Sequence, residues 1–299
     1  MTQLRLGILG QSDGNGHPYS WTAIFNGYDP EVMASCPFPA IPEYLGRRKF
    51  PDDAIADATV THIWTQDRKL SEHIAAAGRI SRIVDRYEEM VGQVDAILLA
   101  RDDAENHYAM SLPFLEAGLP IYVDKPLAYT RPEAERIYGR QVYDGQIFTC
   151  SALAYAAELT LTEADRKQLG KLKSVEAVVM KDWNRYGVHI IEPVLQLIGD
   201  QGKLARITAV DSAGTRTVEI IWESGLVTRF SALGAAATPI EINVIGEHGV
   251  RRLTFTDTFA AFKGALQAFV AVVRKQAQTT PKESVMRVIQ IIEAGNQHG

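Results

Sequence analysis

The sequence has few cysteines and no long apolar run. Cys36 and Cys150 are the only cysteines among its 299 residues. Their spacing is not that of a metal site, so they indicate free thiols in a reducing compartment. A disulfide bond between them is the alternative. The N-terminus enters a strand-like run at 4–9 without a signal segment, and the longest apolar segments, such as 265–273, are too short to span a bilayer. We therefore expect a cytoplasmic protein without a membrane span.

An excess of positive charge is also missing. The net charge is −5, and the largest basic cluster is Arg47-Arg48-Lys49. Nucleic-acid-binding domains normally carry a basic patch, so we expect no nucleic-acid partner. The basic cluster fits either a phosphate contact or a solvated face. Repeats and low-complexity segments are absent, and the length suffices for two domains.

The first part of the chain alternates strand-like and helix-like segments. Strands are predicted at 4–9, 59–65, 82–84, 94–100 and 121–123, and helices at 18–26, 68–77, near 87–90 and before Gly118. This alternation predicts an α/β Rossmann-type domain over residues 1–126, with a doubly wound parallel sheet. The proline-rich segment 27–58 has no clear period and is predicted to be an inserted loop.

Residues 127–299 follow a different pattern. Strand-like runs at 175–180, 207–210, 217–222, 227–230 and 240–245 are interrupted by one predicted helix at 187–198. Strands without alternating helices predict an α+β domain with an open, mainly antiparallel sheet, serving substrate binding and oligomerisation. Two helices follow Phe259, and the last is a candidate to pack back on the first domain.

The turn after the first strand is a candidate dinucleotide-binding loop. A strand, a glycine turn and a helix open such a unit, which makes Gly10, Ser12, Asp13 and Gly14 candidate cofactor contacts. If Gly10 is the first glycine of G-x-G-x-x-G, Ser12 and Asn15 replace the second and third. A plain glycine turn fits the same residues.

The second predicted strand ends at Asp67 and Arg68. An acid at this position is the expected partner of the adenosine ribose hydroxyls, and Arg68 suits a 2′-phosphate. Both NAD and NADP therefore remain candidate cofactors. As an alternative, Asp67 caps the helix that begins near Arg68.

Lys125 lies where the strand 121–123 ends. In open α/β sheets, ligands bind outside the carboxyl ends of the strands. Pro126 favours an extended backbone at Lys125 and removes one N–H group. This arrangement predicts a catalytic lysine, with an exposed lysine that closes a strand as the alternative.

The order of these elements resembles the glucose–fructose oxidoreductase/inositol dehydrogenase/MocA (Gfo/Idh/MocA) family over nearly the whole chain. The most specific segment is Asp124-Lys-Pro-Leu-Ala128, which is similar to the family's E-K-P-L-A motif. The other segments that carry the resemblance are Gly7-Ile-Leu-Gly10, 94–100, His107, Glu116-Ala-Gly118, 186–192, 195–199, 240–249 and 288–294.

The resemblance implies an NAD(P)-dependent oxidoreductase that transfers a hydride between nicotinamide and a hydroxyl or keto carbon of a sugar, sugar derivative or cyclitol. Lys125 would bind the reacting oxygen, His189 would be the general base and Tyr186 a substitute donor. A helix-face histidine with a satisfied hydrogen bond is the alternative for His189. The implied cofactor contacts are those of the glycine turn (Gly10, Ser12, Asp13, Gly14) and Asp67, Arg68, Ala100, Arg101, His107, Asp124 and Lys125. A homodimer or homotetramer is expected, and no metal site.

Arg185 departs from the family pattern, which usually has an aspartate there, one helical turn before the histidine. It is expected either to bind a carboxylate or phosphate of the substrate or to form a structural salt bridge with Asp182 or Glu192. Asp102 and Asp103 stand where relatives commonly have Thr-Pro, and they are expected to receive substrate hydroxyls. The predicted substrate contacts are Arg185, Asp102, Lys125 and His189.

Two other functions remain open. One is a lyase or hydrolase that retains NAD and acts by transient oxidation. The other is a non-catalytic sensor of a dinucleotide or sugar, which the departures at Ser12, Asn15 and Arg185 would allow. Lys125 and His189 favour an enzyme.

Overall fold

The computed structural model describes residues 2–297, which divide into two compact units. The first consists of the chain up to Ala128, Pro132–Thr149 and Phe262–Pro281, and the second of Tyr129–Arg131, Cys150–Ala261 and the chain from Lys282. The expected division had one boundary after residue 126 and a last helix that returned to the first domain. In the structure the returning segment is 262–281, and α11 (Lys282–Gln297) lies in the second unit.

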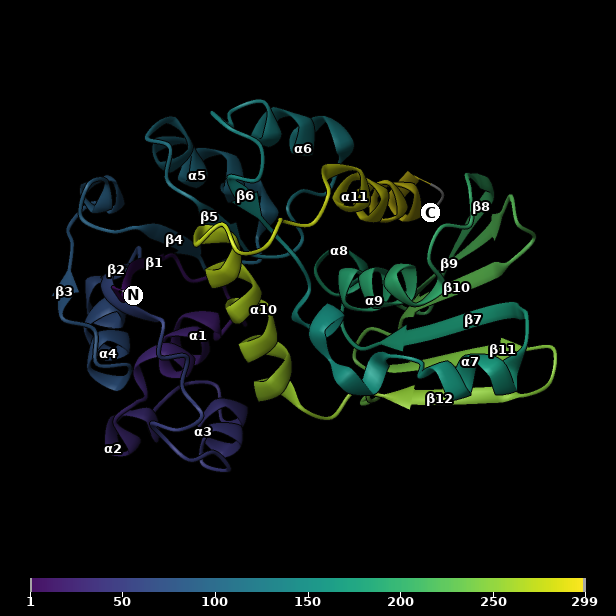
Figure 1. Cartoon of the computed structure of the whole chain (residues 1–299), viewed down its shortest axis with the longest axis horizontal. Coiled ribbons are helices and arrows are strands. Elements are labelled where there is room, and N and C mark those ends of the chain that lie inside the picture. Colours follow the sequence, from purple (N-terminus) through teal and green to yellow (C-terminus); the bar gives the residue numbers. More distant parts are fainter. Residues whose placement is uncertain (1, 298–299) are drawn as a thin grey trace. The chain divides into compact units, whose positions relative to one another are not determined.

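The first unit contains a parallel sheet of six strands. They are β1 (Leu4–Leu9), β2 (Ala58–Trp64), β3 (Arg82–Ile83), β4 (Ala96–Leu99), β5 (Ile121–Val123) and β6 (Ile147–Phe148). Their order is β3-β2-β1-β4-β5-β6 (Figure 1), and every neighbouring pair is parallel. This confirms the predicted doubly wound sheet. The order reverses between β1 and β4, and β4 and β5 are neighbours, so the carboxyl ends of β1, β4 and β5 are adjacent.

The first unit also contains helices, most of which connect these strands. They are α1 (His17–Asn26), α4 (Arg68–Ala77), α5 (His107–Glu116), α6 (Arg131–Tyr138) and the part of α10 (Thr258–Val273) that begins at Phe262, with the 3₁₀ helices η1 (Tyr87–Met90) and η2 (Ala104–Asn106). Trp21 of α1 stacks on Tyr122 of β5, and Phe269 of α10 packs against the same ring. Burial of these large rings joins helices from both ends of the chain to the sheet.

The segment 27–58, predicted to be a loop, contains the short helices α2 (Pro30–Met33) and α3 (Ala40–Leu45). Asp29 caps α2 by accepting hydrogen bonds from the N–H groups of Glu31 and Val32. Met33, Ile41 and Leu45 are buried. Helices this short have no readable period in the sequence, and their apolar side chains are covered only after folding.

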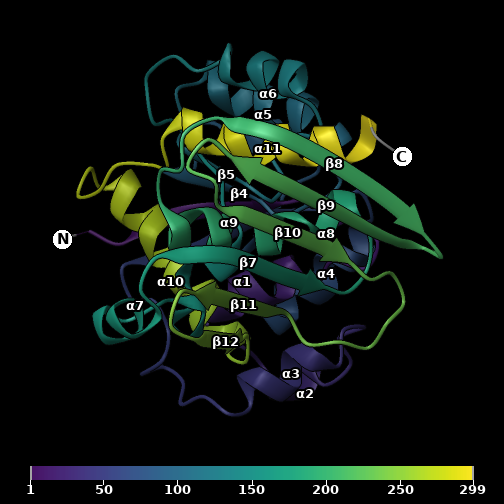
Figure 2. The same ribbon diagram turned by 90° about the vertical axis from the view of Figure 1, so that its right-hand side faces the viewer.

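The second unit contains a mixed sheet. Its strands are β7 (Leu172–Val179), β8 (Leu204–Ser212), β9 (Thr215–Trp222), β10 (Val227–Ala232), β11 (Glu241–Gly246) and β12 (Val250–Thr254), in the order β12-β11-β7-β10-β9-β8 (Figure 2). β7 and β10 are parallel, and the other neighbours are antiparallel. The predicted mainly antiparallel sheet is therefore confirmed.

The two faces of this sheet differ. Val175, Ala177 and Val179 alternate along β7 as buried residues, and α9 (Val188–Ile198) packs on the sheet. On the opposite face, Arg229 of β10 pairs with Glu176 and Glu219 of the flanking strands. The remaining helices are α7 (Glu163–Leu169), α8 (Trp183–Tyr186), α11, η3 (Ala152–Tyr155) and η4 (Ala157–Leu159). The α9 helix is held by the sheet, and it carries His189.

Neither Cys36 nor Cys150 forms a disulfide bond, and both are buried. Among residues 2–297, no helix is both long and apolar enough to cross a membrane. The same residues contain no group of three or more His, Cys, Asp and Glu side chains arranged for a metal ion.

Candidate functional site

The glycine turn follows β1 and needs glycine at Gly10. Its φ is +79°, in the left-handed region, and an added Cβ would collide with the side chain of Arg101. Gly14 also has a positive φ, +75°, but an added Cβ would meet no atom within 4 Å. Asp13 and Gly14 are exposed, so the turn has an open side at these two residues.

Ser12 and Asn15, which replace the second and third glycines of the fingerprint, are buried. The Ser12 hydroxyl donates to Asp102 Oδ1 at 2.6 Å and accepts the Asp102 backbone N–H at 3.2 Å. The Asn15 amide donates to Asp124 Oδ2 at 3.0 Å. Both side chains therefore connect the turn to acids that follow other strands of the sheet.

Lys125 is buried at the end of β5, with 4% of its surface exposed. Its ammonium lies 3.4 Å from Asp102 Oδ2, and Asp102 is equally buried. Ser12, Asp102 and Lys125 follow β1, β4 and β5, whose carboxyl ends are adjacent. The alternative of an exposed lysine that closes a strand is therefore wrong.

Asp124 lies beside Lys125 and is held by several donors. Its carboxylate accepts the Lys125 backbone N–H at 2.8 Å and lies 2.5 Å from His17 Nδ1. His17 also stacks on Trp21, with ring centroids 5.0 Å apart. In the structure His17 begins α1 and is only 15% exposed, because the Asp124 carboxylate and the indole cover it.

Arg101 and Asp103 form a second pair beside this cluster. Arg101 Nε donates to Asp103 Oδ1 at 2.8 Å, and the Asn106 amide donates to Oδ2 at 2.6 Å. Burial acts to raise the pKa of Asp103, but these donors outweigh it and hold the pKa below its usual value. Asp103 is therefore engaged within its own loop.

Ala100 and His107 are completely buried. The Ala100 N–H donates to the Leu9 carbonyl at 3.0 Å. The ring nitrogens of His107 lie 3.0 Å from the Leu127 carbonyl oxygen and 2.8 Å from that of Arg101. His107 thus joins the segments that follow β4 and β5.

Asp67 and Arg68 lie at the end of β2. Asp67 caps α4 by accepting the Lys69 N–H at 2.9 Å, as the capping alternative predicts. Arg68 pairs with Asp85 at 2.7 Å and Glu72 at 3.2 Å, and about half of its side chain is exposed. These two candidate cofactor residues therefore lie outside the Ser12–Asp102–Lys125 cluster.

His189 lies in the first turn of α9, in the second unit. Its Nδ1 is 2.8 Å from the hydroxyl of Ser151, whose backbone N–H donates to Glu192 Oε2 at 2.6 Å. Glu192 is almost completely buried. Burial raises its pKa to about 8, although the Ser151 N–H acts in the opposite direction. His189, Ser151 and Glu192 therefore form one buried hydrogen-bonded group.

Tyr186 lies edge-on to His189, with ring centroids 5.4 Å apart. The Lys181 ammonium donates to the Tyr186 hydroxyl at 2.5 Å and lies 4.4 Å from the ring centroid. Asp182 caps α8 by accepting the Arg185 backbone N–H at 2.9 Å. A short helix before α9 thus presents Arg185 and Tyr186 next to His189 in the chain.

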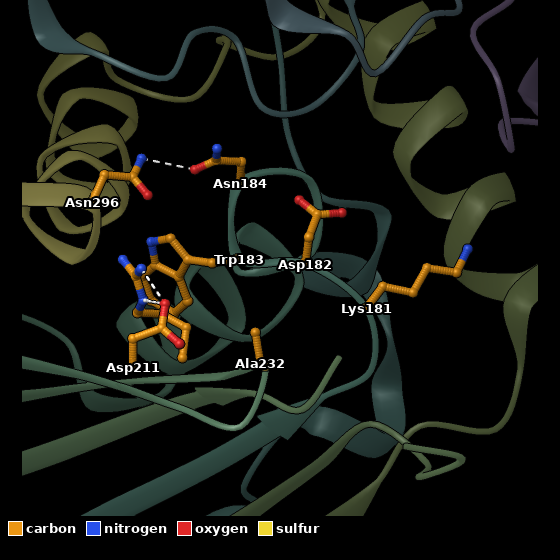
Figure 3. Close-up of a pocket in the computed structure, with 9 residues that line it drawn as sticks. Lys181, Asp182, Trp183, Asn184, Asp211, Ala232 and Asn296 are labelled. Atoms are coloured by element: carbon orange, nitrogen blue, oxygen red, sulfur yellow. Dashed lines mark hydrogen bonds and ion pairs between the residues drawn. The ribbon is translucent and has the colours of Figure 1, made fainter. Parts of the chain in front are cut away.

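A pocket of about 230 Å³ lies within the second unit (Figure 3). It is lined by the segment 181–184, by Asp211, Gly214 and Arg216 of the β8–β9 hairpin, and by Ala232 and Asn296. Asn296 donates to Asn184 at 2.7 Å (Figure 3), and Arg216 pairs with Asp211 at 2.5 Å. Arg185, Tyr186 and His189 are not among its lining residues.

Sequence reasoning missed several of these contacts. Glu192 follows His189 by one turn of the predicted helix 187–198, so this spacing could have indicated it. Ser151 carried no such signal, because it is distant in the chain from His189. The Ser12–Asp102 and Asn15–Asp124 contacts also depend on the sheet order.

Comparison with known proteins agrees with this geometry. Residues 46–150 match the GFO_IDH_MocA family model, described as an oxidoreductase family with an NAD-binding Rossmann fold. This range includes β4, β5 and Lys125 but begins after the glycine turn. No curated protein matches the sequence.

Solved structures share the whole fold. Myo-inositol 2-dehydrogenase from Lactobacillus plantarum has a TM-score of 0.75 and 14% identity, covering 99% of this chain and 97% of its own. Levoglucosan dehydrogenase in complex with NADH and levoglucosan has a TM-score of 0.72 and 14% identity, covering 99% of this chain and 97% of its own. Biliverdin reductase from Synechocystis sp. PCC 6803, in complex with biliverdin and NADP+, has a TM-score of 0.71 and 11% identity, covering 99% of this chain and 99% of its own.

At such identities these likenesses show the fold alone, and the three names cover different substrates. The likeness to the family comes from the matched range, which holds the strand-end acids and Lys125. Residues 46–150 therefore resemble the Gfo/Idh/MocA oxidoreductase family, whose model describes an NAD-binding Rossmann fold.

Proposed function

We propose that the protein is an NAD(P)-dependent oxidoreductase acting on a hydroxyl or keto carbon of a sugar, sugar derivative or cyclitol. The observation that carries this proposal is the buried Lys125 at the end of β5, ion-paired with Asp102 in a Rossmann sheet of an oxidoreductase family. Myo-inositol 2-dehydrogenase and levoglucosan dehydrogenase, which share the fold, support the substrate class.

The glycine turn fits a dinucleotide. The open space at Gly14 leaves room for a phosphate near the backbone. In this proposal residues 10–14 hold the pyrophosphate, Asp67 or Arg68 the adenosine ribose, and Arg101 and Asp124 flank the nicotinamide side. The bound NAD or NADP supplies the hydride chemistry.

The protein's own residues supply charge and a proton acceptor. The Lys125 ammonium donates a hydrogen bond to the reacting oxygen and stabilises negative charge there. Because Ser151 occupies Nδ1 of His189, we assign removal of the hydroxyl proton to Nε2. Tyr186 acts as an additional donor, and Arg185 binds an acidic group of the substrate.

The proposal also includes a homodimer or homotetramer in the cytoplasm. The broad second sheet supports the first part, because its strands carry the charged row of Glu176, Arg229 and Glu219 on one face. The two cysteines without a disulfide bond support the second.

Fluorescence titration with NADH and NADPH, followed by an absorbance screen with polyols and uronates, tests this function. We expect binding of at least one cofactor and a substrate-dependent change in nicotinamide absorbance. Lys125→Met should keep the fold and lose most turnover. Binding with turnover but no net absorbance change would indicate a lyase that retains NAD, and binding without turnover would indicate a sensor. Failure to bind either cofactor would contradict the proposal.

A further inference from the structure

Three neighbouring strand ends place Ser12, Asp102 and Lys125 in a line. Ser12 follows β1, Asp102 follows β4 and Lys125 follows β5. The Ser12 hydroxyl donates to one oxygen of Asp102, and the Lys125 ammonium lies 3.4 Å from the other. Asp102 thus lies between the glycine turn and the candidate catalytic lysine.

The Lys125 ammonium and the Asp102 carboxylate are both buried, so each needs the opposite charge of the other. Lys125 and Asp102 are each 4% exposed. A buried ammonium or carboxylate is costly without a partner of opposite charge, and removal of one partner leaves the other uncompensated. The charge of Asp102 therefore stabilises Lys125 in its position.

The neighbouring acids have other partners. Asp103 accepts hydrogen bonds from Arg101 and Asn106. Asp124 contacts Asn15 and His17. Both oxygens of Asp102 are engaged, one by Ser12 and one by Lys125. This differs from the expected role of Asp102 as a receiver of substrate hydroxyls.

We propose that Asp102 is a positioning residue that holds the Lys125 ammonium towards the reacting oxygen, and that Ser12 fixes the orientation of Asp102. The inference rests on the proposed oxidoreductase function, which it deepens by adding a residue that acts through Lys125. It also gives the serine in the glycine turn a function other than a phosphate contact.

A double-mutant cycle on thermal stability tests the ion pair without requiring activity. Asp102→Asn and Lys125→Met should each lower Tm, and the double variant should lose less than the sum of the two shifts. Asp103→Asn is the matched control, because Asp103 is a neighbouring buried acid paired with Arg101. In the double variant of Asp103→Asn and Lys125→Met, the two Tm shifts should add. If the Tm shifts of Asp102→Asn and Lys125→Met simply add in the double variant, the two side chains do not interact, and the proposed ion pair is wrong.

Steady-state kinetics on a substrate found in the polyol screen tests the positioning role. Asp102→Asn should lower kcat about tenfold or more, with KM changed less than about threefold. Asp102→Glu, which keeps the charge, should retain more activity than Asp102→Asn. Ser12→Ala should give a smaller loss of kcat that disappears in the Asp102→Asn background.

The outcomes separate the two proposals. If the Tm shifts are non-additive but kcat of Asp102→Asn equals that of the wild type, the positioning role is wrong. Asp102 and Lys125 would then form an ion pair that is only structural. Equal kcat losses for Asp102→Glu and Asp102→Asn would also overturn a role based on charge. A wild-type protein that binds NADH but turns over no substrate would remove the oxidoreductase function and the positioning role with it. The stability cycle would still establish or overturn the pair.

Discussion

The two units hold their candidate catalytic side chains in different ways. Lys125 lies in an ion pair with Asp102, next to acids that receive hydrogen bonds from Arg101, Asn15 and His17. His189 instead contacts the hydroxyl of Ser151, beside a carboxyl group whose pKa burial raises to about 8. The lysine therefore depends on a fixed opposite charge, and the histidine depends on hydrogen bonds near a group that titrates close to neutral pH.

The elements that supply these residues also differ. The parallel sheet brings Ser12, Asp102 and Lys125 together because its strands end at one edge. In the second unit a single helix supplies His189 and Glu192, and Ser151 begins η3. A site at the edge of a sheet collects residues from distant parts of the chain, whereas a helix face collects residues one turn apart.

Removal of the histidine should have the largest effect in the second unit. We expect His189→Asn to lower kcat by about 10²–10⁴, because the variant loses the proton acceptor. Ser151→Ala should cause a smaller loss, about tenfold, since imidazole is kept and only its orientation is released. Steady-state kinetics with the best substrate of the polyol screen measures both.

A value of kcat for Ser151→Ala equal to that of the wild type would show that the hydroxyl does not position His189. The contrast with the first unit would then be sharper, because only the lysine would depend on a supporting side chain.

Arg185→Ala tests whether the second unit also recognises charge. If Arg185 binds an acidic group, KM for a uronate should rise about tenfold, and KM for a neutral polyol should change much less. Arg185→Lys is the control, because it keeps the charge but loses the planar fork. Equal changes in KM for both substrates would contradict this role and favour a structural one.

Glu192→Gln should have the smallest effect, on the pH dependence of stability. The folded-state pKa of Glu192 is about 8, above its ordinary value of 4.5. Its stabilising contribution is therefore fully present below about pH 4.5 and is lost as pH rises through about 8, by at most about 1.4 kcal/mol per pH unit. Between about pH 5 and pH 9, Tm of the wild type should fall more than that of Glu192→Gln.

Thermal unfolding at a series of pH values measures this difference. Asp103, whose pKa lies below its ordinary value, is present in both proteins and cancels in the comparison. Parallel Tm profiles would show that Glu192 does not titrate in this range, and this difference between the two units would disappear.

Local patterns in the sequence were enough to predict much of the fold. Apolar runs between glycine and proline predicted β1, β2, β4 and β5, and the alternation with helices predicted the parallel sheet. Two short elements were missed: β6 has two residues and α8 has four, too few to show a period. β12 was also missed, since its first three residues, Val250 to Arg252, are exposed and lack an apolar alternation.

The sequence by itself determined that Lys125 follows a buried strand and that His189 lies in a helix. Both follow from the regular spacing of residues along one element. Only the tertiary structure decided that Asp102 partners Lys125, that Ser12 holds Asp102, and that Ser151 holds His189. These contacts join residues far apart in the chain, and their formation depends on strand order and burial, which no local pattern encodes.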